Sequence, residues 1–212
     1  MKTRHIITIL LTLLIVALVV VLYRSIMQPV KFESEFNQRK DIVVERLKRL
    51  RTMEETYRFA NGKYCGNLDS LILFAQKDSV KVLKKFGTLP DNMTEAEALK
   101  QGILRREVVW VPAYENILER DTNFTTAKEN LEELKYIPFT DPKELFQIGA
   151  SNVDRGGVIV PVFEIKADFA QFLKDLDEQT VLNKIAEVEK ANKYPGWKVG
   201  DLTQPIVDGN WE

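Results

Sequence analysis

The stretch IITILLTLLIVALVVVLY, residues 6–23, decides how the rest of this chain is organised. It carries no charged side chain, and only Thr8 and Thr12 interrupt its run of Leu, Ile and Val residues. As an α-helix that rises about 1.5 Å per residue, it would be roughly 27 Å long, close to the hydrocarbon thickness of a bilayer. The stretch therefore predicts a membrane-spanning helix, whose anchor surface includes Ile6, Leu10, Leu14, Val19 and Tyr23.

Residues 1–5 form a short N-terminal tail whose charges leave a second interpretation open. Lys2 and Arg4 resemble the charged start of a cleaved secretory signal. However, the apolar stretch is longer than the usual apolar core of such a signal, about 7 to 15 residues, and no small-residue cleavage site follows it. These two features favour an anchor that stays in the protein.

Basic residues flank the span unequally. Lys2 and Arg4 are packed into the short tail, whereas the basic residues after the span are spread from Arg24 to Lys40 and diluted by acidic ones. Dense positive charge marks the cytoplasmic side of a span, and long domains cross a membrane largely regardless of their charge. We therefore expect a cytoplasmic N-terminus and an exported domain.

After Pro29, residues 30–61 predict a long amphipathic helix. Residues 32–60 contain no Gly or Pro and are rich in Glu, Arg, Lys and Leu, which favour helix. Asn61 and Gly62 supply a stop, because Gly adopts the left-handed conformation. Apolar side chains share one helical face, which we call the apolar stripe: Phe36, Val43, Leu47, Leu50, Met53 and Tyr57.

Two interpretations of the apolar stripe stay open. Amphipathic helices usually bury their apolar face in the core of their own domain. Alternatively, the stripe is an interaction surface that pairs with a partner protein or a second copy as a coiled-coil stalk. The helix contains fewer than four clean heptads, which weakens this second interpretation.

The end of this helix carries a resemblance to known proteins. Residues 57–64, YRFANGKY, followed by NLDSL at 67–71, resemble the helix end of type IV pilins and type II secretion pseudopilins. In those families a membrane helix runs into an amphipathic helix, and a similar turn leads to a globular domain with an antiparallel sheet. The resemblance covers about a third of the chain. It implies a structural or assembly role.

The chain also departs from the pilin pattern. Pilin precursors carry Gly or Ala before their cleavage point and a Glu near the start of the mature apolar segment. Here Arg4 and His5 stand where the small residue before the cleavage point would be expected. The first carboxylate in the sequence is Glu33, which lies beyond the apolar segment. The whole chain, with its NGKY turn and the segment YPGWKVG at 194–200, also resembles an uncharacterised family of bacterial single-pass envelope proteins. That resemblance implies a location in the cell, the inner membrane, and implies no activity.

Residues 62–212 predict a globular α+β domain. Helices are expected at 68–77 with Asn67 or Asp69 as cap, after a capping box at 94–97, and at 177–191. Strands are expected at 80–82, 107–111 and 136–139, and residues 121–134 as a helix or ordered loop. The clearest hairpin pairs residues 144–148 with 158–165 across a turn at 154–157, and Pro161 indicates an edge or a bulge.

Composition excludes several classes of function. With 30 Lys and Arg against 31 Asp and Glu, the chain lacks the uniform positive field of a typical nucleic-acid-binding protein, so we expect no nucleic-acid partner. His5 is the sole histidine and lies at the membrane edge, and Cys65 is the sole cysteine. A Cys/His metal site and a histidine-dependent triad are therefore excluded, and we expect no metal and no cofactor.

Acidic residues offer no clear catalytic pair. Glu54 and Glu55 are adjacent on a helix and so diverge, while Asp175 and Asp177 lie near an expected helix start, where capping explains them. A glycosidase-like pair would have to be assembled from distant segments. No catalytic residue is therefore assigned.

The segment 194–200 is the remaining candidate site. Tyr194 and Trp197 stand beside the turn-forming Pro195 and Gly196. A rigid aromatic loop can bind a glycan, a peptide or a protein surface, although such rings more often cover a core. Tyr194 and Trp197 are thus a candidate binding loop.

Two functional hypotheses follow. The first is a non-enzymatic, membrane-anchored envelope protein that acts as a structural or assembly component and contacts envelope partners or further copies of itself. The second is a membrane-tethered ligand- or carbohydrate-binding module, with carboxylate-based catalysis as an option. The first places the contact on the helix that contains Leu47 and Leu50 and needs no catalytic residue, and the second needs a cleft.

Overall fold

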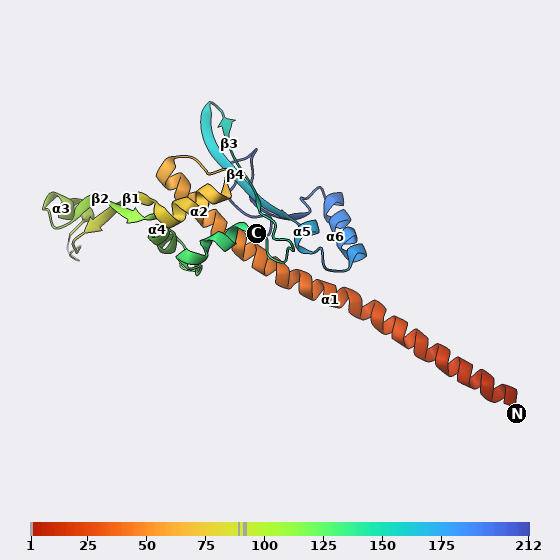
Figure 1. Ribbon diagram of the computed structural model, residues 1–212. Helices are drawn as coiled ribbons and strands as arrows, with labels where there is room; N and C mark the ends of the chain where they lie inside the picture. Colours follow the sequence, from red (N-terminus) through yellow and green to blue (C-terminus); the bar gives the residue numbers. More distant parts are fainter. Residues whose placement is uncertain (1, 89, 91–92) are drawn as a thin grey trace.

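The computed structural model describes the backbone of residues 2–88, 90 and 93–212, and the side chains of these residues apart from 2–4 and 6–9. One long helix runs into a domain that contains a two-stranded and a three-stranded antiparallel sheet with short helices (Figure 1). The predicted α+β fold class is confirmed.

Helix α1 (Lys2–Asn61) is continuous through Pro29. The sequence predicted a membrane-spanning helix at residues 6–23 that continues into an amphipathic helix at 30–61, and the structure joins the two in one helix. Pro29 has no amide hydrogen, so the carbonyl of Ser25 loses its helical donor, but the ring is tolerated without a break in the helix. At the other end Gly62 has a φ of 72° and its N–H donates to the carbonyl of Arg58 at 2.7 Å. The predicted left-handed stop is confirmed.

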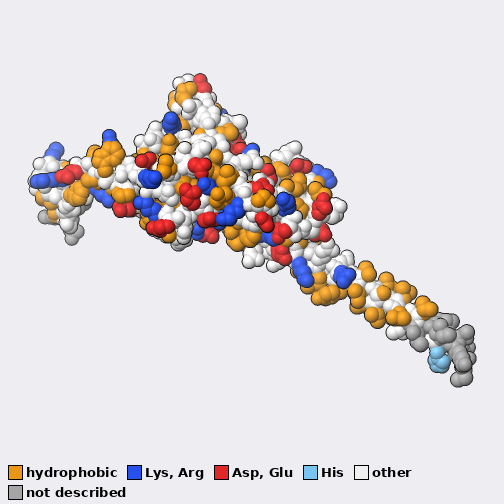
Figure 2. All heavy atoms as spheres, in the orientation of Figure 1, with side chains coloured by type: hydrophobic (Ala, Val, Ile, Leu, Met, Phe, Trp, Pro, Cys, Tyr) orange, Lys and Arg blue, Asp and Glu red, His pale blue; other side chains and the backbone are white. Residues whose placement is uncertain are grey.

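The first part of α1 stands free of the domain and is apolar all round. The anchor side chains of Leu10, Leu14, Val19 and Tyr23 are exposed, and that of Ile6 lies outside the described residues. A window of this helix has a mean hydropathy of 2.5 with none of it buried, and the face of this section seen in Figure 2 is largely hydrophobic. Among the described residues, α1 is the single helix that is long and apolar enough to cross a membrane.

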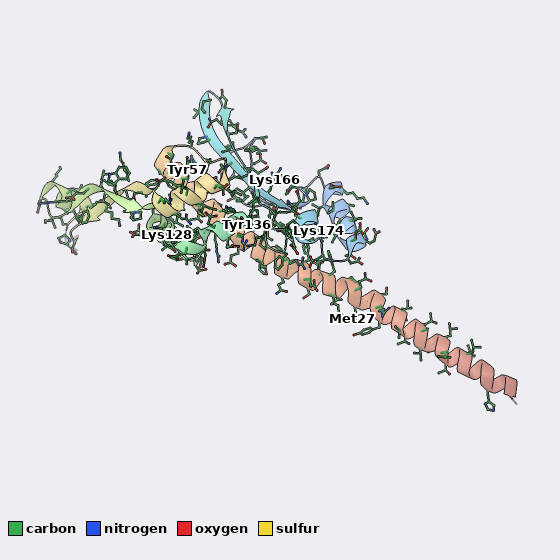
Figure 3. All side chains as sticks on the ribbon, viewed as in Figure 1. Met27, Tyr57, Lys128, Tyr136, Lys166 and Lys174 are labelled. Carbon is green, nitrogen blue, oxygen red and sulfur yellow. The ribbon has the colours of Figure 1, made fainter. Side chains whose placement is uncertain are left out.

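The second part of α1 is the axis of the core. Strands β4 (Val158–Asp168) and β5 (Gly196–Gly200) and the helices α2 (Leu68–Lys77) and α4 (Ala113–Arg120) all contact it. Five residues of the apolar stripe are buried and Tyr57, labelled in Figure 3, is partly buried. The structure therefore places the stripe in the chain's own core. The hypothesis that these side chains form an interaction surface is therefore wrong, because β4, β5, α2 and α4 already cover them.

Arginines on the other faces of α1 tie the surrounding loops to the helix. Arg39 donates to the carbonyl of Phe172 at 2.7 Å and pairs with both carboxylate oxygens of Asp175. Arg46 donates to the carbonyls of Glu133 and Tyr136. The polar side of the helix is thus also partly packed, and the domain surrounds α1 on more than its apolar side.

Strands β1 (Ser79–Phe86) and β2 (Arg105–Pro112) pair along their whole length as an antiparallel hairpin. Val80 and Val111 at its base are buried near α1 and α4, whereas the far end carries helix α3 (Glu95–Lys100) and projects from the domain (Figure 1). We call residues 79–112 the arm. The predicted strands at 80–82 and 107–111 are confirmed as its central parts.

The larger sheet has the order β3-β4-β5, with β3 at Gln147–Arg155. The predicted hairpin is present, but it begins at Gln147, and the register pairs Arg155 with Val158 across a Gly156-Gly157 turn. Pro161 lies where β4 has β3 as its one neighbour, since β5 pairs with Glu164 to Asp168. The expected edge position of this proline is therefore confirmed.

Local capping signals are confirmed as well. Asn67 caps α2, Thr94 and Glu97 form the capping box of α3, and Asp177 caps helix α6 (Glu178–Lys190). The remaining helices are the 3-10 helix η1 (Lys128–Lys135) and α5 (Phe169–Phe172). The strand predicted at 136–139 is reduced to a bridge between Tyr136 and Leu145, because Phe139 at a φ of 63° turns the chain away.

Replacing Leu50 by Ala tests the role of α1 as the core axis. Leu50 is fully buried, so removal of its methyl groups leaves a cavity, and we expect the free energy of unfolding to fall by about 3 kcal/mol. Denaturant unfolding of the detergent-solubilised full chain, followed by tryptophan fluorescence, measures this. Leu73→Ala on the exposed face of α2 is the matched control and should cost less than about 1 kcal/mol. Equal losses in both variants would contradict the core assignment.

Candidate functional site

The candidate loop lines a pocket of about 640 Å³ at the side of the domain. Trp197 lies in β5, and the pocket brings together segments from α1, α6, β5 and the C-terminal tail. We call this site the aromatic–lysine pocket. Its lining residues are Phe36, Lys40, Phe169, Lys184, Val188, Asn192, Lys193, Tyr194, Gly196, Trp197, Lys198, Asn210 and Trp211.

Aromatic rings form the base of the pocket. The ring centroid of Trp197 lies 5.4 Å from that of Phe169 and 6.2 Å from that of Phe36. Phe36 and Phe169 themselves meet edge to face at 5.4 Å. Both phenylalanines are buried, whereas Trp197 and Trp211 are partly exposed. The base of the pocket is thus continuous with the core, and its two indole rings are the part that solvent contacts.

Backbone packing fixes the loop that carries Tyr194 and Trp197. A Cβ added at Gly196 would meet the carbonyl oxygen of Ala167 at 2.2 Å, so this close approach requires glycine. Asn210 donates to the carbonyl of Gly196 at 3.0 Å, and the Tyr194 hydroxyl donates to Asp168. Burial and this carboxylate raise the pKa of Tyr194, so the hydroxyl stays protonated. The walls are therefore held in place before any ligand arrives.

The charged part of the lining is entirely basic among the described residues: four lysines and no carboxylate. Lys198 pairs with Glu164 at 2.9 Å and Asp201 at 3.0 Å, and Lys184 with Glu187 at 3.4 Å. The ammonium of Lys40 lies 5.2 Å from the centroid of Trp197. In the described part of the chain neither Lys40 nor Lys193 has an acidic partner.

The arm offers a second surface, of a different kind. On one face of the hairpin Leu83 lies opposite Val108, and Lys81 lies opposite Trp110. Leu83, Val108 and Trp110 are 58%, 63% and 66% exposed, and Figure 2 shows hydrophobic atoms on the arm. The Lys81 ammonium is 5.0 Å from the Trp110 centroid. We call these four side chains the arm face.

A second hollow, about 630 Å³, runs beside α1 and is lined largely by charged side chains, some of which pair with each other. Arg51 binds Glu212 at 2.9 Å, Arg49 pairs with Glu45, and Thr52 donates to Asp121 at 3.2 Å. The described lining of this groove carries charges of both signs and no aromatic ring, unlike that of the aromatic–lysine pocket.

A buried carboxyl group lies next to the only thiol. Glu54 is 0% exposed; its Oε2 accepts from the Cys65 N–H at 2.8 Å, and its Oε1 has no partner among the described residues. Burial raises the pKa of Glu54 to about 8, against the weaker opposing effect of the Cys65 hydrogen bond. Burial also raises the pKa of Cys65, which keeps this thiol protonated and unreactive. The pair joins the end of α1 to the turn that follows.

The other acidic candidates have structural roles. Asp177 caps α6 as predicted, but Asp175 is not a cap, because its carboxylate pairs with Arg39 of α1. The sequence analysis missed the burial of Glu54, although this residue lies four positions after Leu50 and three before Tyr57 and so falls on the apolar stripe. The arm face went unnoticed too, although alternating Leu83, Val108 and Trp110 could have indicated a strand with one apolar side exposed.

No group of three metal-binding side chains occurs within residues 2–88, 90 and 93–212. Comparison with protein-family models, with curated proteins and with solved structures finds no match to this chain. Its function must therefore be argued from its own surfaces.

Glu54→Gln tests the buried carboxyl group. The pKa of Glu54 is about 8 in the folded state, above the ordinary value of 4.5. At pH values between these two, the carboxyl group is protonated in the folded state and ionised in the unfolded state. The wild-type free energy of unfolding should therefore fall as the pH rises from about 5 to 8, by up to roughly 1.4 kcal/mol per pH unit. Urea unfolding of the full chain at several pH values should show a flatter profile for Glu54→Gln. Glu55→Gln is the control, and a flat wild-type profile would refute the assignment.

Proposed function

We propose that this protein is a non-enzymatic, membrane-anchored component of the cell envelope with a structural or assembly role, of the kind found in a pilus or secretion platform. The observation that carries the proposal is the arm face: a projecting hairpin that exposes Leu83, Val108 and Trp110 to solvent. Exposed apolar clusters on soluble domains are typical of protein-binding surfaces. The proposal therefore moves the partner contact from the buried stripe to the arm.

The geometry of α1 supports a role at a fixed distance from a membrane. From Tyr23 at the end of the apolar segment to Phe32, the first buried side chain among those described, the helix rises about 14 Å. Met27 lies on this free section in Figure 3. The arm and the N-terminus of α1 lie at opposite ends of the molecule in Figure 1. A continuous helix would thus hold the arm face away from the bilayer and toward a partner.

The charges around the arm face indicate the chemistry of that partner. Lys81 flanks the apolar side chains at one end. At the other end Lys85 and Arg106 share one carboxylate, Glu95, so two positive charges are balanced by one negative charge. An apolar patch with an acidic rim is complementary to this surface.

We further propose that α1 crosses the inner membrane once, with the N-terminus in the cytoplasm and the domain in the periplasm. Two features support this topology: the exposed apolar segment of α1 and the dense positive charge of the N-terminal tail. Anchoring by a helix leaves the whole domain available to envelope partners or to a second copy of the chain.

Protease protection tests the topology. Added to spheroplasts, a protease should degrade a C-terminal epitope tag, because the domain would face outward, while cytoplasmic control proteins stay intact. The protein should also remain in the membrane pellet after alkaline washing. Degradation of the tag solely after lysis would reverse the topology, and release by alkaline washing would refute the anchor.

Trp110→Glu tests the arm face. A negative charge in place of the most exposed aromatic ring of the arm face should abolish recovery of cross-linked partners from intact cells without unfolding the domain, because the side chain is exposed. Leu182→Glu on α6 is the matched control, since Leu182 is also exposed but lies away from the arm. Circular dichroism confirms that both variants fold. If both retain the same partners as the wild type, the arm face is not the contact surface.

A second candidate function is a membrane-tethered ligand-binding module. The aromatic–lysine pocket is the observation that favours it, because its volume lies within the usual range of small-molecule sites, about 300 to 1,000 Å³. Its described lining has no carboxylate, so binding rather than carboxylate catalysis is the role proposed for it. Trp197→Ala should remove the binding of a small molecule in a ligand screen, and unchanged binding would place the ligand elsewhere.

A further inference from the structure

The aromatic–lysine pocket combines two features that select a ligand chemistry. Its base presents flat apolar rings, Trp197 and Trp211, and its charged side chains are all lysines among the described residues. The chain as a whole is nearly neutral, with a formal net charge of −1, so this concentration of positive charge is local. A ligand that matches both features has an apolar ring face and a negative charge.

Pairing within the pocket shows which lysines are available to a ligand. Two carboxylates hold Lys198, and one carboxylate lies 3.4 Å from Lys184. Although burial lowers it, the hydrogen bonds to Glu164 and Asp201 raise the pKa of Lys198, so the charge of this lysine is already compensated. Lys40 and Lys193 keep their charges uncompensated in the described part of the chain. They are the two cations that an anion would meet.

The position of Lys40 strengthens this assignment. Its ammonium is held against the indole of Trp197 and is partly buried, on a helix that cannot move without disturbing the core. An anion bound there would gain a charge-assisted hydrogen bond in a place where water screens less than at an open surface. The cation is thus already in place before the ligand arrives.

The mouth of the pocket is polar and uncharged apart from Lys193. Asn192 is exposed at the end of α6, with a φ of 52° that turns the chain toward β5. A side-chain amide offers donors and an acceptor, which suits hydroxyl groups. Indole rings suit the apolar faces of sugar rings, and lysines suit carboxylate or phosphate groups.

We propose that the aromatic–lysine pocket binds an acidic saccharide, with the sugar ring against Trp197 and Trp211 and the acidic group between Lys40 and Lys193. This inference rests on the second candidate function, ligand binding, and names the ligand class for it. It does not depend on the arm face, because the arm contributes no side chain to the lining.

Tryptophan fluorescence of the detergent-solubilised full chain tests the proposal. Trp110→Phe removes the signal of the one tryptophan outside the pocket. In that background, digalacturonate should change the emission, while the neutral disaccharide galabiose, which differs in lacking the carboxylates, should bind at least tenfold more weakly. Binding should also weaken as the salt concentration rises.

Lysine variants locate the charge contact. Lys40→Gln and Lys193→Gln should each weaken digalacturonate binding about tenfold, since each removes one charged contact. Lys190→Gln is the matched control, because Lys190 is an exposed lysine of α6 outside the pocket lining, and it should leave binding unchanged. Circular dichroism should show the same folded state for all three variants.

Several outcomes would overturn the proposal, and they distinguish the failure of the acidic-saccharide assignment from the failure of ligand binding itself. Equal binding of galabiose and digalacturonate, or no effect of either lysine variant, would reject the acidic class but keep ligand binding. Binding of adenosine monophosphate and of neither saccharide would reject the saccharide and also keep ligand binding. No response to any of these probes at millimolar concentration would reject both the acidic saccharide and the ligand-binding function.

Discussion

The helix α1 serves two environments along one continuous backbone, and the rest of the structure depends on the change between them. From Leu10 to Tyr23 its side chains are exposed and, apart from Thr12, apolar, as a membrane span would require. From Phe32 onward the apolar residues narrow to one stripe, which β4, β5, α2 and α4 cover. The helix continues through this change, although Pro29 removes one backbone hydrogen bond, so one continuous helix connects the apolar segment to the domain.

Arginine side chains of α1 hold the surrounding loops of the domain against the helix. Arg39, Arg46 and Arg51 reach three different segments: the region after α5, the end of η1 and the C-terminal tail. Each arginine binds backbone carbonyls or a carboxylate, so loops without a large apolar face of their own are held in place. Burial lowers the pKa of Arg46, which reflects how far this contact is removed from water.

Once α1 is covered, two surfaces remain that the core does not use. The arm face is exposed and largely apolar, which suits the surface of another protein. The aromatic–lysine pocket is concave and basic, which suits a small anionic molecule. The two lie on different segments, so an assembly role and a ligand-binding role are compatible in one molecule.

The sequence by itself determined the features that depend on neighbouring residues: the apolar span, the Gly62 stop, the cap at Thr94 and the Gly156-Gly157 turn. The tertiary structure alone decided that the apolar stripe faces the core and that Glu54 is buried. It also brought Lys40 and Lys193 to one pocket from distant positions. The physical reason is that caps and turns are set by local backbone geometry, whereas burial depends on which remote segment covers a given face.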